Sequence, residues 1–408
     1  MPKGYNLSDQ DREMMKAALK ATGCHVLAAR TLLGNQGHHY SQGTISNLLT
    51  RIPRKDKIEW REAYDELKEV ALTPAKHILK VDDLLVRSAL IKKLRRGKAT
   101  PADLATQFEC EVDLIHSMVG TLREAGYNVE FKGGAYSIGN KPGPKEGEDI
   151  LVDNSPLTKM VQTYGVISDT HLCSRYQRLD VLEAAYNEYQ RLGIKRVFHC
   201  GNMVDGHCHF NRFDLLVTGL TDQAHYVLDH YPQRAGMTTY FITADDHEGW
   251  WQQREGIDFG KYLVYEATNV GRKDLVWLGY EEADVEFRTP GGGNTVRLMH
   301  PGGGSAYALS YAPQKIVESF QGGEKPGVLL IGHYHKAMYA YVRNVHTLQC
   351  GTCEDQTLFM RKQKLEAHVG FWTVSMRQDI NGAIREFSPT FTAFYDRGYH
   401  QNLVVKGK

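Results

Sequence analysis

The sequence predicts a mixed α/β protein in which small helical modules precede a layered domain of strands and helices. Before residue 139, apolar side chains recur three and four positions apart, as in Leu84, Leu85, Ala89 and Leu90, the period of an amphipathic helix. From about residue 160, short apolar runs alternate with loops and helical stretches, as in α/β domains. Between them, residues 140–158 are rich in glycine, proline and acidic residues, and we interpret them as a linker.

The length and charge of the chain bound its function. Its 408 residues allow two or three domains of ~150 residues each. Its formal net charge is only +1, so binding to nucleic acid would depend on local basic patches. The chain shows no apolar run long enough for a membrane span and no signal peptide at its start. We therefore expect a cytoplasmic protein with no membrane segment, whose seven cysteines are free thiols.

The first module, residues 1–75, carries a helix-turn-helix pattern. Residues 25–33 and 41–49 predict two helices separated by the loop GNQGHHY, with Ser41 as a plausible N-cap. Polar side chains on the second helix are able to reach a groove of DNA. The pattern predicts a DNA-binding module.

The second module, residues 79–139, carries a stronger pattern. Helices are expected over 82–96, from Pro101 onward, and over 112–125, and the segment YNVEFKGGAYSI predicts two strands around Gly133 and Gly134. Three helices followed by a hairpin resemble a winged helix-turn-helix. In that resemblance the third helix and the hairpin face nucleic acid.

A basic cluster in the second module supplies the candidate nucleic-acid contacts. Its members are Lys92, Lys93, Arg95, Arg96 and Lys98, which are able to neutralise phosphates. The segment before residue 150 holds 23 basic and 20 acidic residues, so it is only mildly positive. The alternative is a docking or dimerisation module whose cations belong to a solvated helix end. We prefer DNA as the partner and leave homodimerisation open.

Acids and histidines gather in five short blocks, each after a predicted strand. Since the carboxyl ends of strands build the sites of α/β sheets, these blocks are expected to meet. A spacing of two on an extended backbone points both side chains the same way, so such a pair is able to hold one ion. The blocks are Asp169-Thr-His171, Asn202-Met-Val-Asp205, Asp245-Asp246-His247-Glu248, His300, and His333-Tyr-His335.

In their order these blocks resemble the signature of the calcineurin-like metallophosphoesterase superfamily, D-x-H, G-D-x-x-D, G-N-H-D/E, H and G-H-x-H. The resemblance covers about residues 160–395, and SDTH, GHYH and HPGGGSAYALSY look most like bacterial and phage members, including the DNA-repair nuclease branch. It implies a four-layer α/β/β/α metallophosphoesterase sandwich over residues 159–400. Five ordered blocks are far more specific than any one of them.

The resemblance also implies roles for individual residues. One metal ion would be bound by Asp169, His171 and His335, and a second by Asp246, His300 and His333, with Asn202 between them; His247 would donate a proton to the leaving group or stabilise the transition state. Two divalent ions activate water for attack on phosphorus. Nitrogen and oxygen ligands without thiolate suit manganese, our first expectation, and also iron, zinc or nickel.

One feature departs from the superfamily pattern. Asn202 stands where a bridging aspartate is expected, and Asp246 stands where an asparagine ligand is expected. An amide offers one neutral oxygen, whereas a carboxylate offers two anionic oxygens. Either the exchange is compensatory, with Asp246 supplying the anion from the other side, or one metal ion binds weakly and catalysis is slow or absent. We favour the first because the other blocks are intact.

We therefore expect a metal-dependent phosphodiesterase, and more specifically a DNA nuclease with a dinuclear centre. Two alternatives remain open at this point. One is a phosphatase of small substrates or a cyclic-nucleotide phosphodiesterase. The other is a DNA-binding protein with a degenerate metal site. Asp205, Asp245 and Glu248 are weaker candidates as acceptors that support the ligands, and Tyr307, Tyr311 and Tyr334 as side chains that stack on a base.

Overall fold

A computed structural model describes residues 9–21, 29, 52–53, 84–139, 150–153, 160–304 and 306–395. The chain divides into two compact units, residues 1–80 and 81–408. In the first unit, helix α1 spans Asp9–Ala21 and buries Met15, Ala18 and Leu19, the three- and four-residue spacing of an amphipathic helix. The helices expected over 25–33 and 41–49 lie, apart from Ala29, outside the described residues.

The second unit begins with three helices and a hairpin, in the places where the sequence indicates them. The helices are α5 (Leu84–Arg96), α6 (Pro101–Gln107) and α7 (Val112–Glu124), and the strands are β1 (Val129–Lys132) and β2 (Ala135–Ile138). Thr100 and Asp103 form a capping box at the start of α6. Gly133 and Gly134 have positive φ at the turn between antiparallel strands β1 and β2. That this module is a winged helix remains a prediction.

Backbone hydrogen bonds join this module to the domain that follows it. The amide of Asn128 donates to the carbonyl of Gly256 over 2.8 Å, and the amide of Asp258 donates to the carbonyl of Gly126 over the same distance. Paired backbone groups are costly to separate in a buried setting. The three-helix module and the later domain therefore lie in one compact unit, residues 81–408. The predicted domain boundary between them stays a prediction.

The first large sheet has six strands in the order β14-β13-β4-β5-β6-β7. Strands β4 to β7 pair in parallel, and β13 joins β4 and β14 in antiparallel fashion. The strands are β4 (Val161–Ile167), β5 (Arg196–Cys200), β6 (Thr238–Thr243), β7 (Leu275–Tyr280), β13 (Gly370–Gln378) and β14 (Ile384–Ala393).

The second large sheet has the order β11-β12-β10-β9-β8-β3. Its edge strand β3 lies inside the stretch predicted as a linker, 140–158, and pairs in parallel with β8. The apolar triplet Ile-Leu-Val explains this difference, since such residues favour strands even between glycine- and proline-rich neighbours. The strands are β3 (Ile150–Asp153), β8 (Glu282–Thr289), β9 (Gly292–Met299), β10 (Val328–Ile331), β11 (Ala337–Val342) and β12 (Val345–Cys350).

Apolar clusters fill the space between the layers of this domain. One cluster lies between the sheets and includes Val166 and Phe198. Their neighbours Ile167 and Val197 belong to a second cluster, in which the first sheet packs against its helices. Successive side chains along a strand point to opposite faces, which explains this alternation. The helices are α8 (Leu179–Arg191), α9 (Leu220–His230), α10 (Trp250–Glu255), α11 (Phe259–Asn269), α12 (Tyr311–Ser319), the 3₁₀ turn η1 (Gly322–Glu324) and α13 (Leu358–Lys362).

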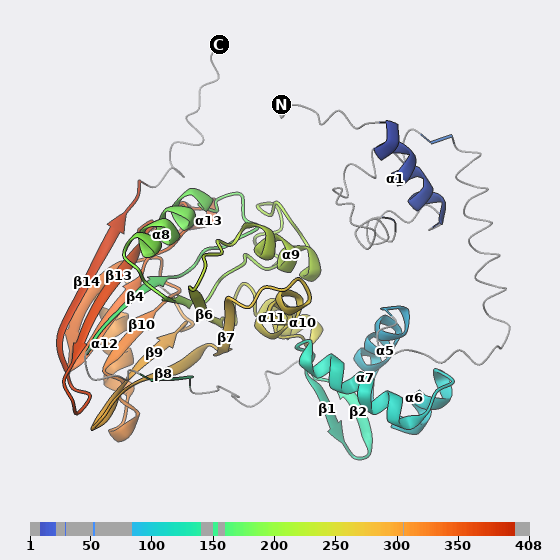
Figure 1. The fold of residues 1–408 in the computed structure, drawn as a ribbon, viewed down its shortest axis with the longest axis horizontal. Helices are drawn as coiled ribbons and strands as arrows, with labels where there is room; N and C mark the ends of the chain where they lie inside the picture. Colours follow the sequence, from blue (N-terminus) through green and yellow to red (C-terminus); the bar gives the residue numbers. More distant parts are fainter. Residues whose placement is uncertain are drawn as a thin grey trace, which may run out of the picture. The chain divides into compact units, whose positions relative to one another are not determined.

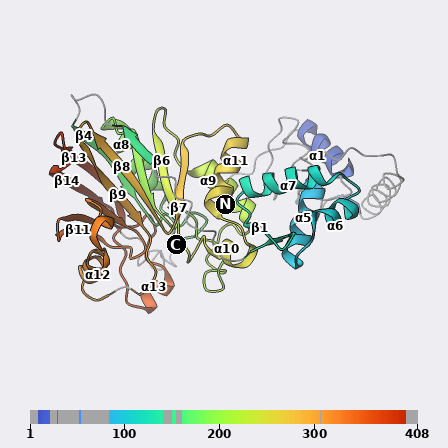
Figure 2. The same cartoon turned by 90° about the horizontal axis from the view of Figure 1, so that it is seen from below.

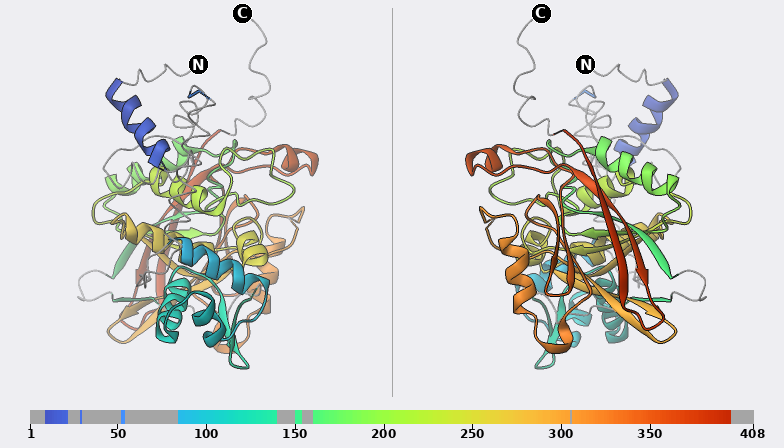
Figure 3. Two further views of the ribbon diagram at one scale, coloured as in Figure 1. Left: turned by 90° about the vertical axis from the view of Figure 1, so that its right-hand side faces the viewer. Right: turned by 90° about the vertical axis from the view of Figure 1, so that its left-hand side faces the viewer.

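Helix α12 covers the outer face of the second sheet, where its Val317 packs against Leu329 and Ile331 of β10. Figure 1 shows the strands of both sheets, and Figures 2 and 3 show α8 and α12 on opposite sides of them. The order helix, sheet, sheet, helix confirms the predicted α/β class, with layers of the predicted kind. Among the described residues, none of the helices combines the length and the apolar character needed to cross a membrane.

Candidate metal centre

The predicted ligands follow the carboxyl ends of strands from both sheets. Asp169 and His171 follow β4, Asn202 follows β5, and Asp246 follows β6. From the second sheet, His300 follows β9, and His333 and His335 follow β10. Since the two sheets are stacked, these ends meet in one place, and their loops carry the side chains into it.

The backbone at these loop positions adopts an unusual conformation. Among the described residues, eleven non-glycine residues have positive φ, and five of them are predicted ligands: Asp169, His171, Asn202, His333 and His335. Such a conformation costs free energy for residues with a side chain, and it persists only where the surroundings impose it. Backbone strain of this kind clusters at functional sites, so its concentration at these residues supports the loops as the candidate site.

Asp169, His171 and His335 form a first trio of donors whose ligand atoms lie within 4.8 Å of one another. The Oδ1 atom of Asp169 lies 3.4 Å from His335 Nε2 and 3.8 Å from His171 Nε2. Burial opposes ionisation of Asp169, but the hydrogen bonds and charges of the surrounding histidines hold its pKa well below its ordinary value. The trio therefore presents an anionic oxygen beside two imidazoles.

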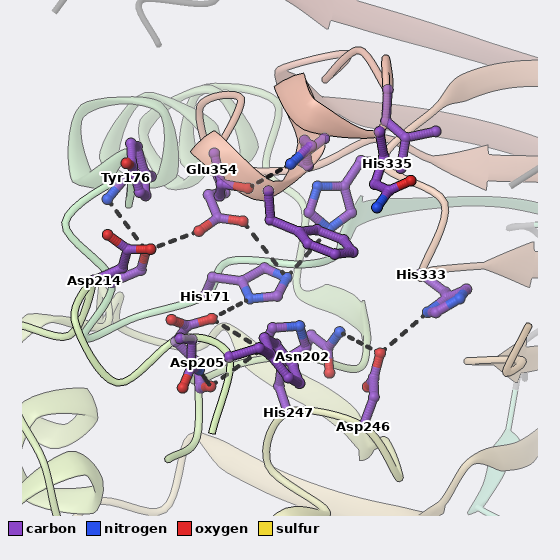
Figure 4. A pocket seen from close by; sticks show the side chains of 18 of the residues that line it. His171, Tyr176, Asn202, Asp205, Asp214, Asp246, His247, His333, His335 and Glu354 are labelled. Carbon is purple, nitrogen blue, oxygen red and sulfur yellow. Dashed lines mark hydrogen bonds and ion pairs between the residues drawn. The ribbon is translucent and has the colours of Figure 1, made fainter. Parts of the chain in front are cut away.

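Asp246, His300 and His333 form a second trio with the same compactness. Oδ2 of Asp246 lies 3.2 Å from His333 Nδ1, and its Oδ1 lies 3.7 Å from His300 Nε2. Figure 4 shows Asp246 between Asn202 and His333. Burial lowers the pKa of His300, which keeps this imidazole neutral, the form that binds a metal ion.

Hydrogen bonds fix the orientation of three of the four imidazoles. His300 Nδ1 lies 2.6 Å from the carbonyl oxygen of Cys200, and His333 Nε2 lies 2.6 Å from that of Gly303. His171 Nδ1 lies 3.0 Å from Asp205 Oδ1. Because a carbonyl or carboxylate accepts from the protonated nitrogen, the other nitrogen of each ring is directed to its trio as a donor to a cation.

Three atoms at the centre are buried without a hydrogen-bond partner: Asn202 Oδ1, Asp246 Oδ1 and His300 Nε2. Buried polar atoms normally have partners, because leaving one unsatisfied costs roughly 1–3 kcal/mol. All three are atoms that bind metal ions. These residues therefore fit a divalent cation, which would satisfy the atoms that the protein leaves open.

Asn202 lies between the two trios, as expected from its place in the sequence. Its Nδ2 is 3.5 Å from Asp169 Oδ1 and 3.5 Å from Asp246 Oδ2. Asp169 Oδ1 also lies 4.0 Å from His300 of the second trio. Each trio therefore has a carboxylate of its own, and the neutral amide separates them.

Asp205 holds two imidazoles at once. Its Oδ1 lies 3.0 Å from His171 Nδ1 and 2.9 Å from Nδ1 of His247, the predicted proton donor, as Figure 4 shows. Burial and His171 lower the pKa of His247, but Asp205 and Asp246 outweigh them and raise it above its ordinary value. A raised pKa favours the protonated form that a general acid requires.

Glu248 ties together the loops that carry Asn202 and Asp246. Its Oε1 accepts from the amides of Asn202 and Ala244, both at 3.0 Å, and its Oε2 accepts from Met203 over 2.8 Å and from Val204 over 3.3 Å. Burial raises the pKa of Glu248 to about 8, opposed by these N–H donors. Its role is to position the loops.

Glu354 is a site residue that sequence reasoning missed. It follows β12, is 2% exposed, and places Oε2 3.9 Å from His171 Nε2, while Oε1 accepts from Ser174 over 2.8 Å. Burial raises the pKa of Glu354 to about 7, and the charge of His171 opposes this. Its place after a strand end is the only sequence signal for it, because it belongs to none of the five blocks.

A cavity of about 700 Å³ opens over both trios, within the range of small-molecule sites. His171, Asn202, Asp246, His333 and His335 line its base. Its walls include apolar side chains from the loop after β5 and from the region of α13. The cavity therefore gives a ligand access to the centre.

The predicted nucleic-acid contacts lie away from these trios in the sequence and belong to α5 and the residues after it. Lys92, Lys93, Arg96 and Lys98 are exposed. Arg95 is exposed as well, and it donates to the carbonyl and the carboxylate of Glu255, over 3.0 and 3.2 Å. Its guanidinium therefore contributes to the contact between the three-helix module and the later domain.

Comparisons with known proteins find distant similarity. No family model and no curated protein matches the chain. Solved structures that resemble it include an archaeal phosphodiesterase, with 12% identity, 57% of this chain and 100% of that chain covered, and a TM-score of 0.32. GAP50, the anchor in the inner membrane complex of Plasmodium, shares 12% identity with this chain. The match covers 57% of this chain and 84% of that chain, and its TM-score is 0.35.

A third similar structure is Vps29 from Entamoeba histolytica in complex with zinc. It shares 11% identity, covers 57% of this chain and 100% of that chain, and has a TM-score of 0.27. Likeness at this distance carries no conclusion about chemistry. The geometry of the two trios and the cavity above them are the features that bear on function.

Proposed function

We propose that this protein is a metal-dependent phosphodiesterase with a dinuclear centre. The observation that carries the proposal is the meeting of two Asp/His trios around buried ligand atoms that lack hydrogen-bond partners. Asp169, His171 and His335 would hold one divalent ion, and Asp246, His300 and His333 the other. When bound, such a pair lowers the pKa of water and neutralises the charge of a phosphate.

The protein's own groups have complementary tasks in this proposal. Asp205 contacts Nδ1 of both His171 and His247. It would thereby direct Nε2 of His171 to the first ion and hold the protonated ring of His247 beside the cavity. His247 would then donate a proton to the leaving oxygen, and its partial exposure of 19% gives it access to a substrate.

The positions of Asn202 and Asp246 support the interpretation that their exchange is compensatory. Because each trio has its own carboxylate, a neutral residue between them leaves neither ion without an anion. The degenerate-site alternative predicts that one ion binds weakly and that catalysis is slow or absent. Against it stands the observation that, among the described residues, both trios keep three donors each.

We propose DNA as the polymer that the protein cleaves, with manganese as the preferred ion. The exposed cations Lys92, Lys93, Arg96 and Lys98 support binding to a phosphate backbone. The test is hydrolysis of bis(p-nitrophenyl) phosphate and of linear, nicked and single-stranded DNA with Mn²⁺. Cleavage of DNA supports a nuclease, whereas cleavage of small phosphates alone supports a small-substrate enzyme, and retardation of DNA without cleavage supports a binding protein.

A further inference from the structure

Two exposed phenylalanine rings stand at the cavity above the candidate metal centre. Phe210, from the loop after β5, is 50% exposed, and Phe359 of α13 is 57% exposed. Both line the cavity, and their ring centroids lie 6.3 Å apart with planes tilted by 33°. Exposing two large apolar rings to water is unfavourable, and their pairing beside a functional cavity indicates a partner that covers them.

The position of Phe210 connects this pair to the reaction. Its ring meets that of His247 edge to face, with centroids 5.5 Å apart and planes at 89°. A group held against Phe210 therefore lies beside the proposed proton donor. The pair is placed to bind the part of a substrate that adjoins the reacting phosphate.

The remaining lining of the cavity restricts the chemistry of that group. Among the described residues that line it, none is lysine or arginine, whereas Asp205, Asp214, Asp246 and Glu354 are acidic. Such a wall is unsuited to a run of neighbouring phosphates, which protein sites neutralise with cations. One phosphate at the centre, joined to a flat uncharged group, fits the cavity best.

We propose that Phe210 and Phe359 form a subsite for an unpaired nucleobase, so that the substrate presents a single nucleoside phosphodiester to the centre. This rests on the proposed function and narrows its substrate class. Bases stack on aromatic rings with little preference for sequence. A base within a duplex is covered by its neighbours, so the subsite selects a strand end, an unpaired nucleotide or a short nucleotide diester.

Two diesters with the same leaving group test this inference. Thymidine 5′-(p-nitrophenyl phosphate) carries a base, and methyl p-nitrophenyl phosphate does not. We expect the double variant Phe210→Leu, Phe359→Leu to lower kcat/KM for the thymidine diester by about 5- to 150-fold, the worth of one stacking contact, and to leave the methyl diester within about twofold. Equal losses for both diesters, or no loss, would overturn the subsite.

Phe213→Leu provides the matched control. Phe213 belongs to the same loop as Phe210 and is 75% exposed, but it does not line the cavity. This variant is expected to hydrolyse both diesters like the parent. Octyl p-nitrophenyl phosphate tests another apolar occupant, and a higher kcat/KM for this ester than for the thymidine diester would contradict a nucleobase subsite.

A binding measurement separates failure of the subsite from failure of the proposed function. Stacking of a 2-aminopurine dinucleotide on phenylalanine changes its fluorescence and requires no turnover. We expect saturable quenching with the parent protein and at least about fivefold weaker binding with the double variant. If neither diester is hydrolysed but this difference persists, the subsite stands without the enzyme; if the two proteins bind equally, the inference is wrong.

Discussion

The two trios of the candidate centre use the same side-chain types in different surroundings. Side chains of the first trio are 0%, 1% and 11% exposed, and Asp205 and Glu354 add carboxylates around His171. In the second trio, Asp246 is 29% and His333 19% exposed, and its own carboxylate is that of Asp246. Although burial opposes it, the pKa values of Asp169 and Asp205 are lowered by the neighbouring histidines, so both carboxylates are ionised near His171. Because negative charge attracts a cation, the first trio is expected to bind its ion more tightly.

Substitution of Asp169, which lies near imidazoles of both trios, is expected to have the largest effect on metal binding and activity. Asp169 Oδ1 lies within 4.0 Å of imidazole nitrogens from both trios, so Asp169→Ala should weaken both ions. Loss of a direct ligand should lower kcat/KM by more than the ~10–100-fold that loss of a supporting partner costs. Steady-state hydrolysis with titrated Mn²⁺ checks this, with unfolding monitored alongside. Activity within threefold of the parent would refute a shared role for Asp169.

His247 distinguishes chemistry from metal binding. His247→Gln should lower kcat by about 10²–10⁴-fold, the usual contribution of a general acid. Metal content is measured alongside, because the donor atoms of His247, His171 and Asp205 also lie within 4.8 Å of one another. The check is kcat for a diester with a poor leaving group, compared with one carrying p-nitrophenol, which needs little protonation. Equal losses for both leaving groups would argue against proton donation.

Exchanging the residues at positions 202 and 246 tests whether Asp246 supplies the negative charge that Asn202 lacks. Asp246→Asn alone removes the second trio's carboxylate and should cost ~10–100-fold in affinity for the second ion. Asn202→Asp alone crowds a third carboxylate between Asp169 and Asp246 and should also lower activity. The double variant Asn202→Asp, Asp246→Asn should equal or exceed the parent. If both single variants match the parent in metal content and rate, the compensation is absent.

Substitution of Glu248, which holds the loops of Asn202 and Asp246 in place, is expected to affect catalysis least. Glu248→Gln places an NH₂ group opposite backbone amides that donate to the carboxylate, which should lower the free energy of unfolding by about 1–3 kcal/mol. The second ion should weaken more than the first, because Glu248 holds the loops of Asn202 and Asp246. Chemical denaturation and Mn²⁺ titration measure both effects, and unchanged stability would contradict the positioning role.

The sequence predicts the α/β class, and it predicts which acids and histidines lie close together, because motifs at strand ends keep a local signature. Asp169, His300 and His335 lie together as their blocks suggest. Glu354, Phe210 and Phe359 carry no such signature. They reach the site only because loops and helix α13 from separate parts of the chain fold over it. Such tertiary contacts are not encoded in local sequence patterns.

The same limit applies to the boundaries between domains. The stretch 140–158 has the composition of a linker, yet pairing with β8 recruits Ile150–Asp153 as an edge strand. The contact of Arg95 with Glu255 likewise depends on residues far apart in the chain. Neither feature follows from local composition, since strand partners and ion-pair partners are chosen by the fold.

The number of metal ions per chain decides whether the two trios are cation sites. The parent protein, purified without chelator and reconstituted with Mn²⁺, should hold two ions by mass spectrometry of the metals. His333→Ala should retain the tighter ion, and Asp169→Ala should lose both. A parent that binds no ion, or variants that keep the parent's full content, would contradict the account of two adjoining cation sites.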